Sequence, residues 1–268
     1  MLGSQVKYYT LRSAWAAGVT TETLREICKR VRWPKGQARL FGSSTKVEKG
    51  EEQGVLTMVH YGAPAGQLAW AGVLNQCPDA CSGCIKACLG RTAGRMVFDS
   101  VRNAQNWKTL FVWYDPQGAR TLARQELKAH RRKAQKLGKL AAARWNGTTD
   151  NPDFADSLET PDVVLYDYTK DNVAAWRGHR GLSPVHSTLS YNVKNGEECR
   201  NFLHYGGTVA VVFRTRDPAA FPKTWNGYPV INGDETDIRF RDPAGTVVGL
   251  TAKGSAMRDR TGWVQEIA

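Results

Sequence analysis

From Gly54 onward the chain alternates short apolar segments with helix-like segments, and this alternation constrains the fold more than any other feature. We expect strands at 55–60, 140–145, 163–168, 185–190 and 208–214, with short further strands at 230–231 and 246–250. We expect helices between them at 97–114, 117–137, 151–158, 173–177 and 197–205. Apolar strands that are joined through helices pair in parallel by right-handed crossovers. The sequence therefore predicts an α/β fold with parallel strands, as a partial (β/α)6-like or TIM-like barrel.

The first 50 residues differ from the rest. They are basic and mixed in character, with one helix expected at 21–32, capped by Thr21 and ended by Pro34-Lys35-Gly36. The polar segment 42–54 is expected to be a linker or loop. We therefore predict a small N-terminal basic extension over 1–50 and an α/β barrel-like domain over 51–268, with a cysteine loop at 77–88.

The net charge of +12 favours a polyanionic partner, with a nucleotide or nucleic acid first among them. The basic residues cluster at 29–32 and 128–139. No run of 18 apolar residues is present, so we expect no membrane partner. The first residues contain no apolar signal segment, which predicts a cytoplasmic protein. The sequence gives no indication of the oligomeric state.

Four of the six cysteines fall within twelve residues, at Cys77, Cys81, Cys84 and Cys88. A disulfide framework does not suit a chain of this length without a secretion signal, whereas closely spaced thiols suit a soft metal centre. An iron–sulfur cluster or, as the alternative, zinc could bind here. Zinc sites generally use paired CxxC knuckles, and only one CxxC occurs. The other two cysteines are expected to be buried apolar residues of helices, Cys28 and Cys199.

Polar residues follow successive predicted strands, where parallel barrels carry their chemistry. The segment 146–150 follows the second strand and 167–171 follows the third. Ser187 and Ser190 lie near the end of the fourth. These positions are the candidate site beside the cysteines.

The spacing Cys77-x3-Cys81-x2-Cys84 after the first strand resembles the CxxxCxxC motif of radical S-adenosylmethionine enzymes. The resemblance implies that three thiolates hold a 4Fe–4S cluster and that S-adenosylmethionine is a cofactor. In that family a turn after the second strand and a polar residue of the fourth strand bind the cofactor. The matching positions here are Asn146, Gly147 and Thr148, and Ser187 or Ser190.

The sequence also departs from this family. Gly83 stands where the family usually has an aromatic residue, and Cys88 is a fourth cysteine that the motif does not explain. Cys88 could close the cluster, and the alternative register Cys77, Cys84 and Cys88 is open.

The whole chain resembles a family of tailed-bacteriophage proteins that share this cysteine-rich loop. The shared segments are 144–150 (RWNGTTD), 166–170 (YDYTK) and 249–254 (GLTAKG). This resemblance implies a phage-encoded protein that works in the cytoplasm of the host cell, and it implies no particular activity.

Three functions follow as hypotheses. The first is a radical S-adenosylmethionine-like enzyme that acts on a nucleotide or nucleic acid, with Asp150, Asp167, Tyr168 and Lys170 at the site. The second is a zinc-dependent base-exchange enzyme similar to tRNA-guanine transglycosylases, with Asp150 and Asp167 as its paired carboxylates. The third is a non-catalytic domain, stapled by metal, whose basic helix at 120–139 binds nucleic acid.

Overall fold

The computed structural model describes residues 1–92 and 94–267, apart from the side chains of residues 45 and 46. Its strands are β1 (Phe41–Gly42), β2 (Val55–His60), β3 (Leu140–Arg144), β4 (Val163–Thr169), β5 (Val185–Ser190), β6 (Val209–Phe213), β7 (Thr224–Trp225), β8 (Tyr228–Asn232) and β9 (Val247–Thr251). Its α-helices are α1 (Gly3–Ala16), α2 (Thr21–Arg30), α3 (Thr45–Glu48), α4 (Ser82–Lys86), α5 (Leu89–Thr92), α6 (Asp99–Tyr114), α7 (Pro116–Lys136), α8 (Pro152–Asp156), α9 (Asn172–His179) and α10 (Gly196–His204).

The strands of the described residues form one nine-stranded sheet in the order β1-β2-β3-β4-β5-β6-β9-β8-β7. Strands β2 to β6 pair in parallel with their sequence neighbours, and β9 and β8 extend the parallel part. Only the edge strands β1 and β7 pair antiparallel. The predicted α/β class with parallel strands is therefore confirmed. The sheet is not closed, so a TIM-like barrel is not confirmed, and the partial barrel stays a prediction.

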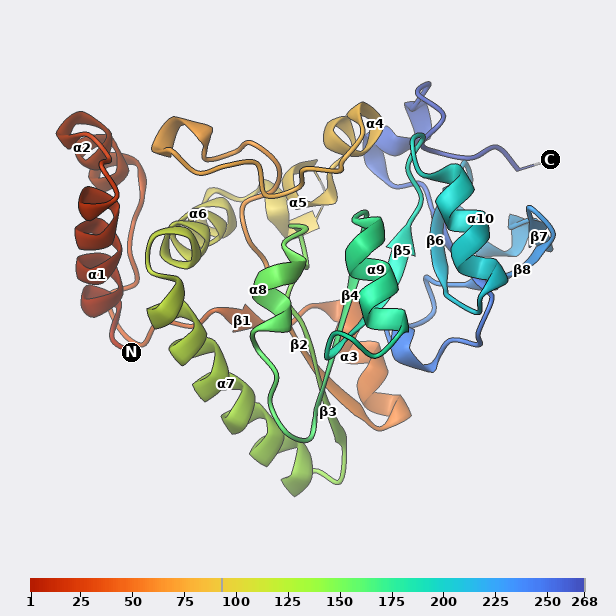
Figure 1. Cartoon of the computed structure of the whole chain (residues 1–268), viewed down its shortest axis with the longest axis horizontal. Coiled ribbons are helices and arrows are strands. Elements are labelled where there is room, and N and C mark those ends of the chain that lie inside the picture. Colours follow the sequence, from red (N-terminus) through yellow and green to blue (C-terminus); the bar gives the residue numbers. More distant parts are fainter. Residues whose placement is uncertain (93, 268) are drawn as a thin grey trace.

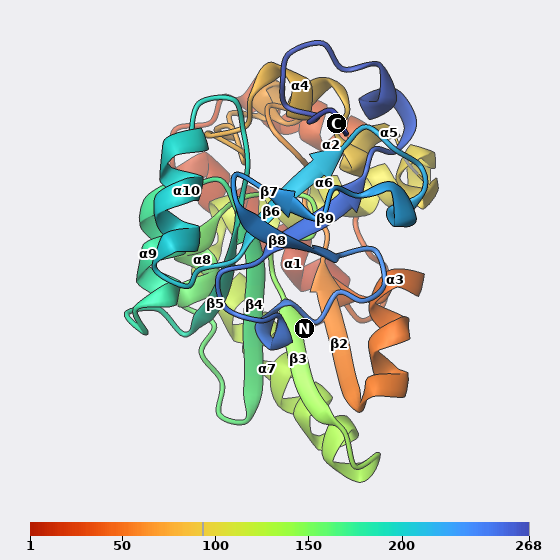
Figure 2. The ribbon, with the colours of Figure 1, turned by 90° about the vertical axis from the view of Figure 1, so that its right-hand side faces the viewer.

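The helices that connect the parallel strands lie on one face of the sheet. Strands that follow one another in sequence order require every right-handed crossover to pass over the same face. Figure 1 shows α8, α9 and α10 side by side in front of the strands, and Figure 2 shows them together on one side of the sheet. The opposite face is covered over β4 and β5 by a short 3-10 helix, η5 (Arg239–Arg241), which follows β8. Ile238 packs there with Val55, Ala142 and Tyr166.

The N-terminal residues are part of the main hydrophobic core. Val6 and Ala14 of α1 and Ile27 of α2 are buried in the same cluster as Leu110 of α6 and Leu127 of α7. Helix α1 packs against α6 as well as against α2. The segment 1–50 thus contributes apolar side chains to the core of the α/β unit.

Three sequence predictions in this N-terminal part differ from the structure in detail. The side chain of Thr20, not Thr21, caps α2 and accepts the backbone N–H of Thr23 at 3.2 Å. Cys28 is exposed rather than buried, whereas Cys199 is buried as expected. The segment predicted as a linker instead contains α3 and a 3-10 helix over Lys49–Gln53.

Parallel pairing places the carboxyl ends of β2 to β6 and of β9 at one edge of the sheet. Side chains alternate between faces along each strand, and paired residues in register share a face. Asp167 is paired with Ser187, and Tyr168 with Thr188, so the two pairs point to opposite faces.

Among the described residues, no helix is long and apolar enough to cross a membrane.

Candidate metal centre and substrate pocket

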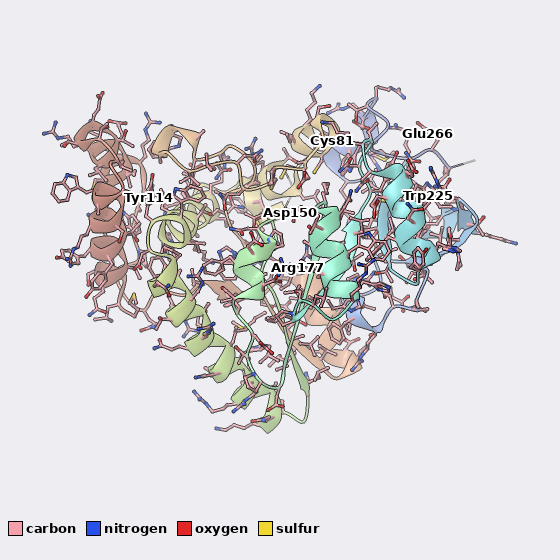
Figure 3. The ribbon with its side chains drawn as sticks, viewed as in Figure 1. Cys81, Tyr114, Asp150, Arg177, Trp225 and Glu266 are labelled. Carbon is pink, nitrogen blue, oxygen red and sulfur yellow. The ribbon has the colours of Figure 1, made fainter. Side chains whose placement is uncertain are left out.

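A pocket of about 330 Å³ opens at the carboxyl ends of the parallel strands. Its walls come from the cysteine segment, from the loop after β3, from the ends of β4 and β5, and from β6 and β9. Figure 3 shows Cys81 beside α4 and Asp150 in the loop above α8, both at this upper end of the molecule. The predicted site residues that line the pocket are Cys77, Cys84, Cys88, Asn146, Gly147, Thr148, Asp150, Tyr168, Lys170 and Ser190.

Three predicted site residues do not line this pocket: Cys81, Asp167 and Ser187. Cys81 is buried at the start of α4. Ser187 lies on the face of β5 that packs on α9, where a Cβ on Gly178 would come within 2.8 Å of the serine Oγ. The structure thus brings ten of the predicted positions together around one space and leaves these three outside it.

The cysteine segment connects β2 to α6. Cys84 lies in α4, and Cys88 lies directly before α5. Cys84 and Cys88 both line the pocket, although Cys88 lies between the two helices. Cys77 approaches from the preceding loop, where the N–H of Ala65 donates to its Sγ at 3.4 Å.

The thiols of Cys77 and Cys88 are buried enough to hold their protons. Burial raises the pKa of Cys77 to about 11, and it also raises the pKa of Cys88. The Sγ of Cys77 donates to the carbonyl oxygen of Thr148 at 3.9 Å. A thiolate is the form that ligates a metal, so binding must displace these protons.

Lys170, directly after β4, lines the pocket together with Cys77, Cys84 and Cys88. Burial lowers the pKa of its ammonium, but the negative charges that Cys84, Asp150, Cys77 and Cys81 carry when ionised outweigh burial, and the net shift is upward. The positive charge of Lys170 in turn lowers the pKa of the Cys88 thiol, whereas burial raises it. The half-buried Lys170 therefore lines the same pocket as Cys77, Cys84 and Cys88, and its charge favours the thiolate form of Cys88.

Asp150 connects the loops around the pocket. Its Oδ1 accepts from Thr169 Oγ1 at 2.8 Å and its Oδ2 accepts from the backbone N–H of Lys170 at 2.8 Å. Its own N–H donates to the carbonyl oxygen of Gln76 at 2.7 Å, one residue before Cys77. Burial raises the pKa of Asp150. The carboxylate thus fixes the β3 loop relative to the end of β4 and to the cysteine segment.

The turn after β3 is held by internal hydrogen bonds. Asn146 Oδ1 accepts from Thr149 Oγ1 at 3.0 Å and from the N–H of Asn151 at 2.9 Å. Thr148 Oγ1 donates to the carbonyl oxygen of Gly62 at 2.6 Å. Gly147 packs tightly on β2, since a Cβ there would lie 2.6 Å from the carbonyl oxygen of His60. A glycine is required at this position for that approach.

Asp167 supports this turn from behind. Its two carboxylate oxygens accept from the N–H and the Nδ2 of Asn146, at 2.8 and 3.1 Å. Arg144 Nε lies 3.7 Å from its Oδ1. Burial outweighs these partners and raises the pKa of Asp167 to about 7. Asp167 therefore positions Asn146 and does not face the pocket.

Arg144, which the sequence analysis did not assign to the site, lines the pocket and stacks on the predicted residue Tyr168. The guanidinium carbon lies 4.5 Å from the centre of the Tyr168 ring, within the range of a cation–π contact. Arg144 Nη1 also pairs with Asp237 Oδ2 at 3.2 Å. Burial raises the pKa of Tyr168, so its hydroxyl stays protonated at neutral pH. The alternation of side chains along β3 and β4 is the sequence feature that could have added Arg144 to the site.

A second unpredicted group comes from the ends of β8 and β9. Asp234 Oδ2 accepts from the N–H and Oγ1 of Thr251, at 2.8 and 2.6 Å, and its Oδ1 pairs with Lys253 Nζ at 3.0 Å. Burial opposes ionisation, but these bonds dominate and lower the pKa of Asp234. All three residues line the pocket. Their position as polar residues at strand ends is the sequence feature that could have identified them.

The C-terminal segment closes one wall of the pocket. Trp263 lines it, and a Cβ on Gly83 would lie 2.3 Å from Thr261 Oγ1 and 2.9 Å from Trp263 Cβ. Arg214 holds this segment by donating to the carbonyl oxygens of Met257 and Asp259, at 2.6 and 2.7 Å. The space that an aromatic side chain at position 83 would need is therefore filled by the C-terminal turn.

The donor set is of a kind that suits a soft metal centre, since both zinc and iron–sulfur clusters bind Cys thiolates. Three of the four cysteines line one pocket. Within residues 1–92 and 94–267, the side chains of His, Cys, Asp and Glu form no group of three or more that is placed to hold a metal ion. The choice between an iron–sulfur cluster and zinc therefore stays a prediction.

Comparison with known proteins gives one result. No curated protein and no solved structure matched the chain. A family model described as "Gene product 88" matches residues 27–266, which is most of the chain. This match supports the predicted resemblance to a family of the phage type and leaves the resemblance to radical S-adenosylmethionine enzymes a prediction. The chain belongs to the gene product 88 family.

Proposed function

We propose that this protein is an iron–sulfur enzyme that uses S-adenosylmethionine to begin radical chemistry on a nucleotide or nucleic acid. One observation carries the proposal. Cys77, Cys84 and Cys88 line a single pocket at the carboxyl ends of sequentially ordered parallel strands, and Lys170 lines it with them. Ligand sites of open parallel sheets lie at this edge.

Three of the four cysteines would hold the cluster, Cys77 and Cys84 with either Cys81 or Cys88, and a reduced cluster would supply the electron that cleaves S-adenosylmethionine. Thiolate ligands bring net negative charge into a buried place, and Lys170 offsets it. Asp150 keeps Lys170 and the loop before Cys77 in position through the hydrogen bonds described above. The Trp263 wall limits the access of water, which protects reactive species.

The rest of the pocket offers partners for the polar groups of the cofactor. S-adenosylmethionine carries an amino group, a carboxylate and ribose hydroxyls. The hydroxyls of Thr148 and Ser190 and the carboxylate of Asp234 could accept hydrogen bonds from them, and Lys253 could pair with the carboxylate. The Tyr168 hydroxyl donates to Asp237 Oδ1 at 3.4 Å, so Tyr168 lines this space without a free donor.

The base-exchange alternative receives less support from the geometry. It requires Asp150 and Asp167 to face one substrate, but only Asp150 lines the pocket. Asp167 already accepts two hydrogen bonds from Asn146. The non-catalytic alternative placed nucleic acid on the basic helix α7, whose C-terminal end lies at the lower end of the molecule in Figure 1, away from the pocket.

The test is the iron and acid-labile sulfide content of protein purified without oxygen, followed by reduction in the presence of S-adenosylmethionine. We expect about four iron and four sulfide per chain, and formation of 5′-deoxyadenosine on reduction. Iron and sulfide without cofactor cleavage would keep the cluster and overturn the radical chemistry. One zinc per chain without sulfide would overturn the proposal in favour of base exchange or a structural metal.

A further inference from the structure

The outward face of α1 combines exposed aromatic and basic side chains. Tyr8 is 60% exposed and Trp15 is 68% exposed, and the Lys7 and Arg12 side chains beside them are exposed. Tyr8, Arg12 and Trp15 are spaced four and three residues apart, so they form one stripe along the helix. A shallow groove beside this stripe is lined by Ser4, Lys7, Tyr8, Leu11 and Arg12.

Packing of the core does not account for this stripe. The opposite face of α1 supplies the buried contacts, through Val6, Thr10 and Ala14. Large aromatic side chains generally bury most of their surface, and an exposed aromatic cluster indicates an interaction site. Figure 1 shows α1 at the far left edge of the molecule, away from α4 and the cysteine pocket. The family match begins at residue 27, so α1 also lies outside the matched residues.

We propose that this face of α1 binds single-stranded nucleic acid, with Tyr8 and Trp15 stacking on bases and Lys7 and Arg12 contacting phosphates. Alternating aromatic and cationic groups are the pattern by which proteins hold single strands without sequence preference. Helix α1 contains no acidic residue, so nothing on the helix itself offsets its two cations. The inference is independent of the proposed function, because it uses no pocket residue.

The charge of this face favours single-stranded nucleic acid over two other occupants, a second copy of the chain and a membrane surface. A second copy of the chain packed on this face by a two-fold axis would bring two patches of the same positive charge together. A membrane surface would require a broad apolar face, whereas the exposed face of α1 also carries Ser4, Gln5 and Arg12. A polyanion with accessible bases satisfies both the cations and the aromatic rings.

The test measures binding of the full chain to a fluorescent 20-nucleotide oligothymidylate by anisotropy, at salt concentrations from about 50 to 200 mM. We expect Tyr8→Ser/Trp15→Ser to weaken binding about tenfold or more, because the stacking of bases on both rings is lost. The salt slope should not change, because neither substitution removes a charge. We expect Lys7→Gln/Arg12→Gln to lower the salt slope by about 1.4, since each phosphate contact in a single strand contributes about 0.7.

A matched control changes cations on the other basic helix. Lys133→Gln/Lys136→Gln, at exposed positions near the end of α7, should leave oligothymidylate binding within twofold of the unaltered protein. Loss of binding in this α7 variant with no loss in the α1 variants would overturn the inference. So would α1-dependent binding to anionic phospholipid vesicles in place of the oligonucleotide, or a dimer that Tyr8→Ser/Trp15→Ser dissociates in sedimentation. All these side chains are exposed, and unchanged thermal unfolding verifies that each variant folds.

Discussion

The backbone N–H of Lys170 donates to Oδ2 of Asp150 at 2.8 Å, and this bond fixes a cationic residue that lines the cysteine pocket. Asp150→Ala removes this acceptor and the one for Thr169 Oγ1, leaving two buried donors unpaired. We expect a loss of about 2–4 kcal/mol in the free energy of unfolding, measured in urea, and lower iron content after anaerobic purification. Asp153→Ala is the control, because its side chain is 90% exposed, and it should change neither quantity. Equal effects of the two substitutions would contradict the role given to Asp150.

Serine substitution of single cysteines tests which thiols hold the cluster. Cys77 and Cys84 belong to both possible registers, so Cys77→Ser and Cys84→Ser should each remove most of the iron and sulfide. Because Cys88 lines the pocket and Cys81 does not, we expect Cys88→Ser to lose more iron than Cys81→Ser. The measurement is iron and sulfide per chain with the visible spectrum. The control is Cys199→Ser, which lies in a separate hydrophobic cluster and should keep the metal. The opposite order for Cys81 and Cys88 would establish the CxxxCxxC register instead.

Removal of the Lys170 charge tests its electrostatic role. Lys170→Met keeps a side chain of similar length but removes the cation, and reduction adds negative charge to the site. We therefore expect a lower reduction potential with iron content nearly unchanged, measured by an electron paramagnetic resonance titration. Lys194→Met, at an exposed position, is the matched control. A potential equal to that of the unaltered protein would show that Lys170 is too far from the metal to act on it.

Much of this architecture was predictable because the strands carry a clear apolar pattern. Strand β5 begins and ends at the residues that the sequence predicted, and the alternation of strands with helices correctly indicated parallel pairing. Helix α1 was missed because it lacks the usual start signal: Leu2 occupies its N-cap position and provides no side-chain hydrogen bond. Its aromatic residues also face outward, which hides the helical periodicity of the buried ones.

The site was predicted in composition but not in orientation. Asp167 and Tyr168 are neighbours at the end of β4, and a strand cannot point both side chains to one face. Register decides which one faces the pocket: Ser187 shares the face of Asp167, which lies against the helices. The group of Asp234, Thr251 and Lys253 depends on the pairing of β8 with β9, a long-range contact that no local pattern specifies.

Asp167 makes stability depend on pH. Burial raises its pKa to about 7 in the folded chain, above the ordinary value of 3.8. Between about pH 4 and pH 7 the folded state therefore binds more protons than the unfolded state. The free energy of unfolding should then fall as pH rises through this window, by at most about 1.4 kcal/mol per pH unit from this group. Asp167→Asn should flatten the slope in urea unfolding, whereas Asp99→Asn, with a side chain 88% exposed, should not. A free energy of unfolding that rises with pH across this window, equally in the Asp167→Asn variant and in the unaltered protein, would contradict this assignment.

Gly83 tests whether the C-terminal segment forms a wall of the pocket. A methyl group at this position would overlap Thr261 Oγ1, Asp259 Oδ1 and Trp263 Cβ, at distances from 2.3 to 2.9 Å. Because Arg214 anchors the segment through two carbonyl oxygens, it cannot move away freely, and we expect Gly83→Ala to destabilise the fold by about 1–3 kcal/mol. Proteolysis should also cleave the C-terminal segment faster in this variant. Gly66→Ala is the control, since no atom lies within 4 Å of its added methyl group. If both variants unfold at the same urea concentration, the C-terminal segment does not pack on α4 in solution, and Trp263 does not close the pocket.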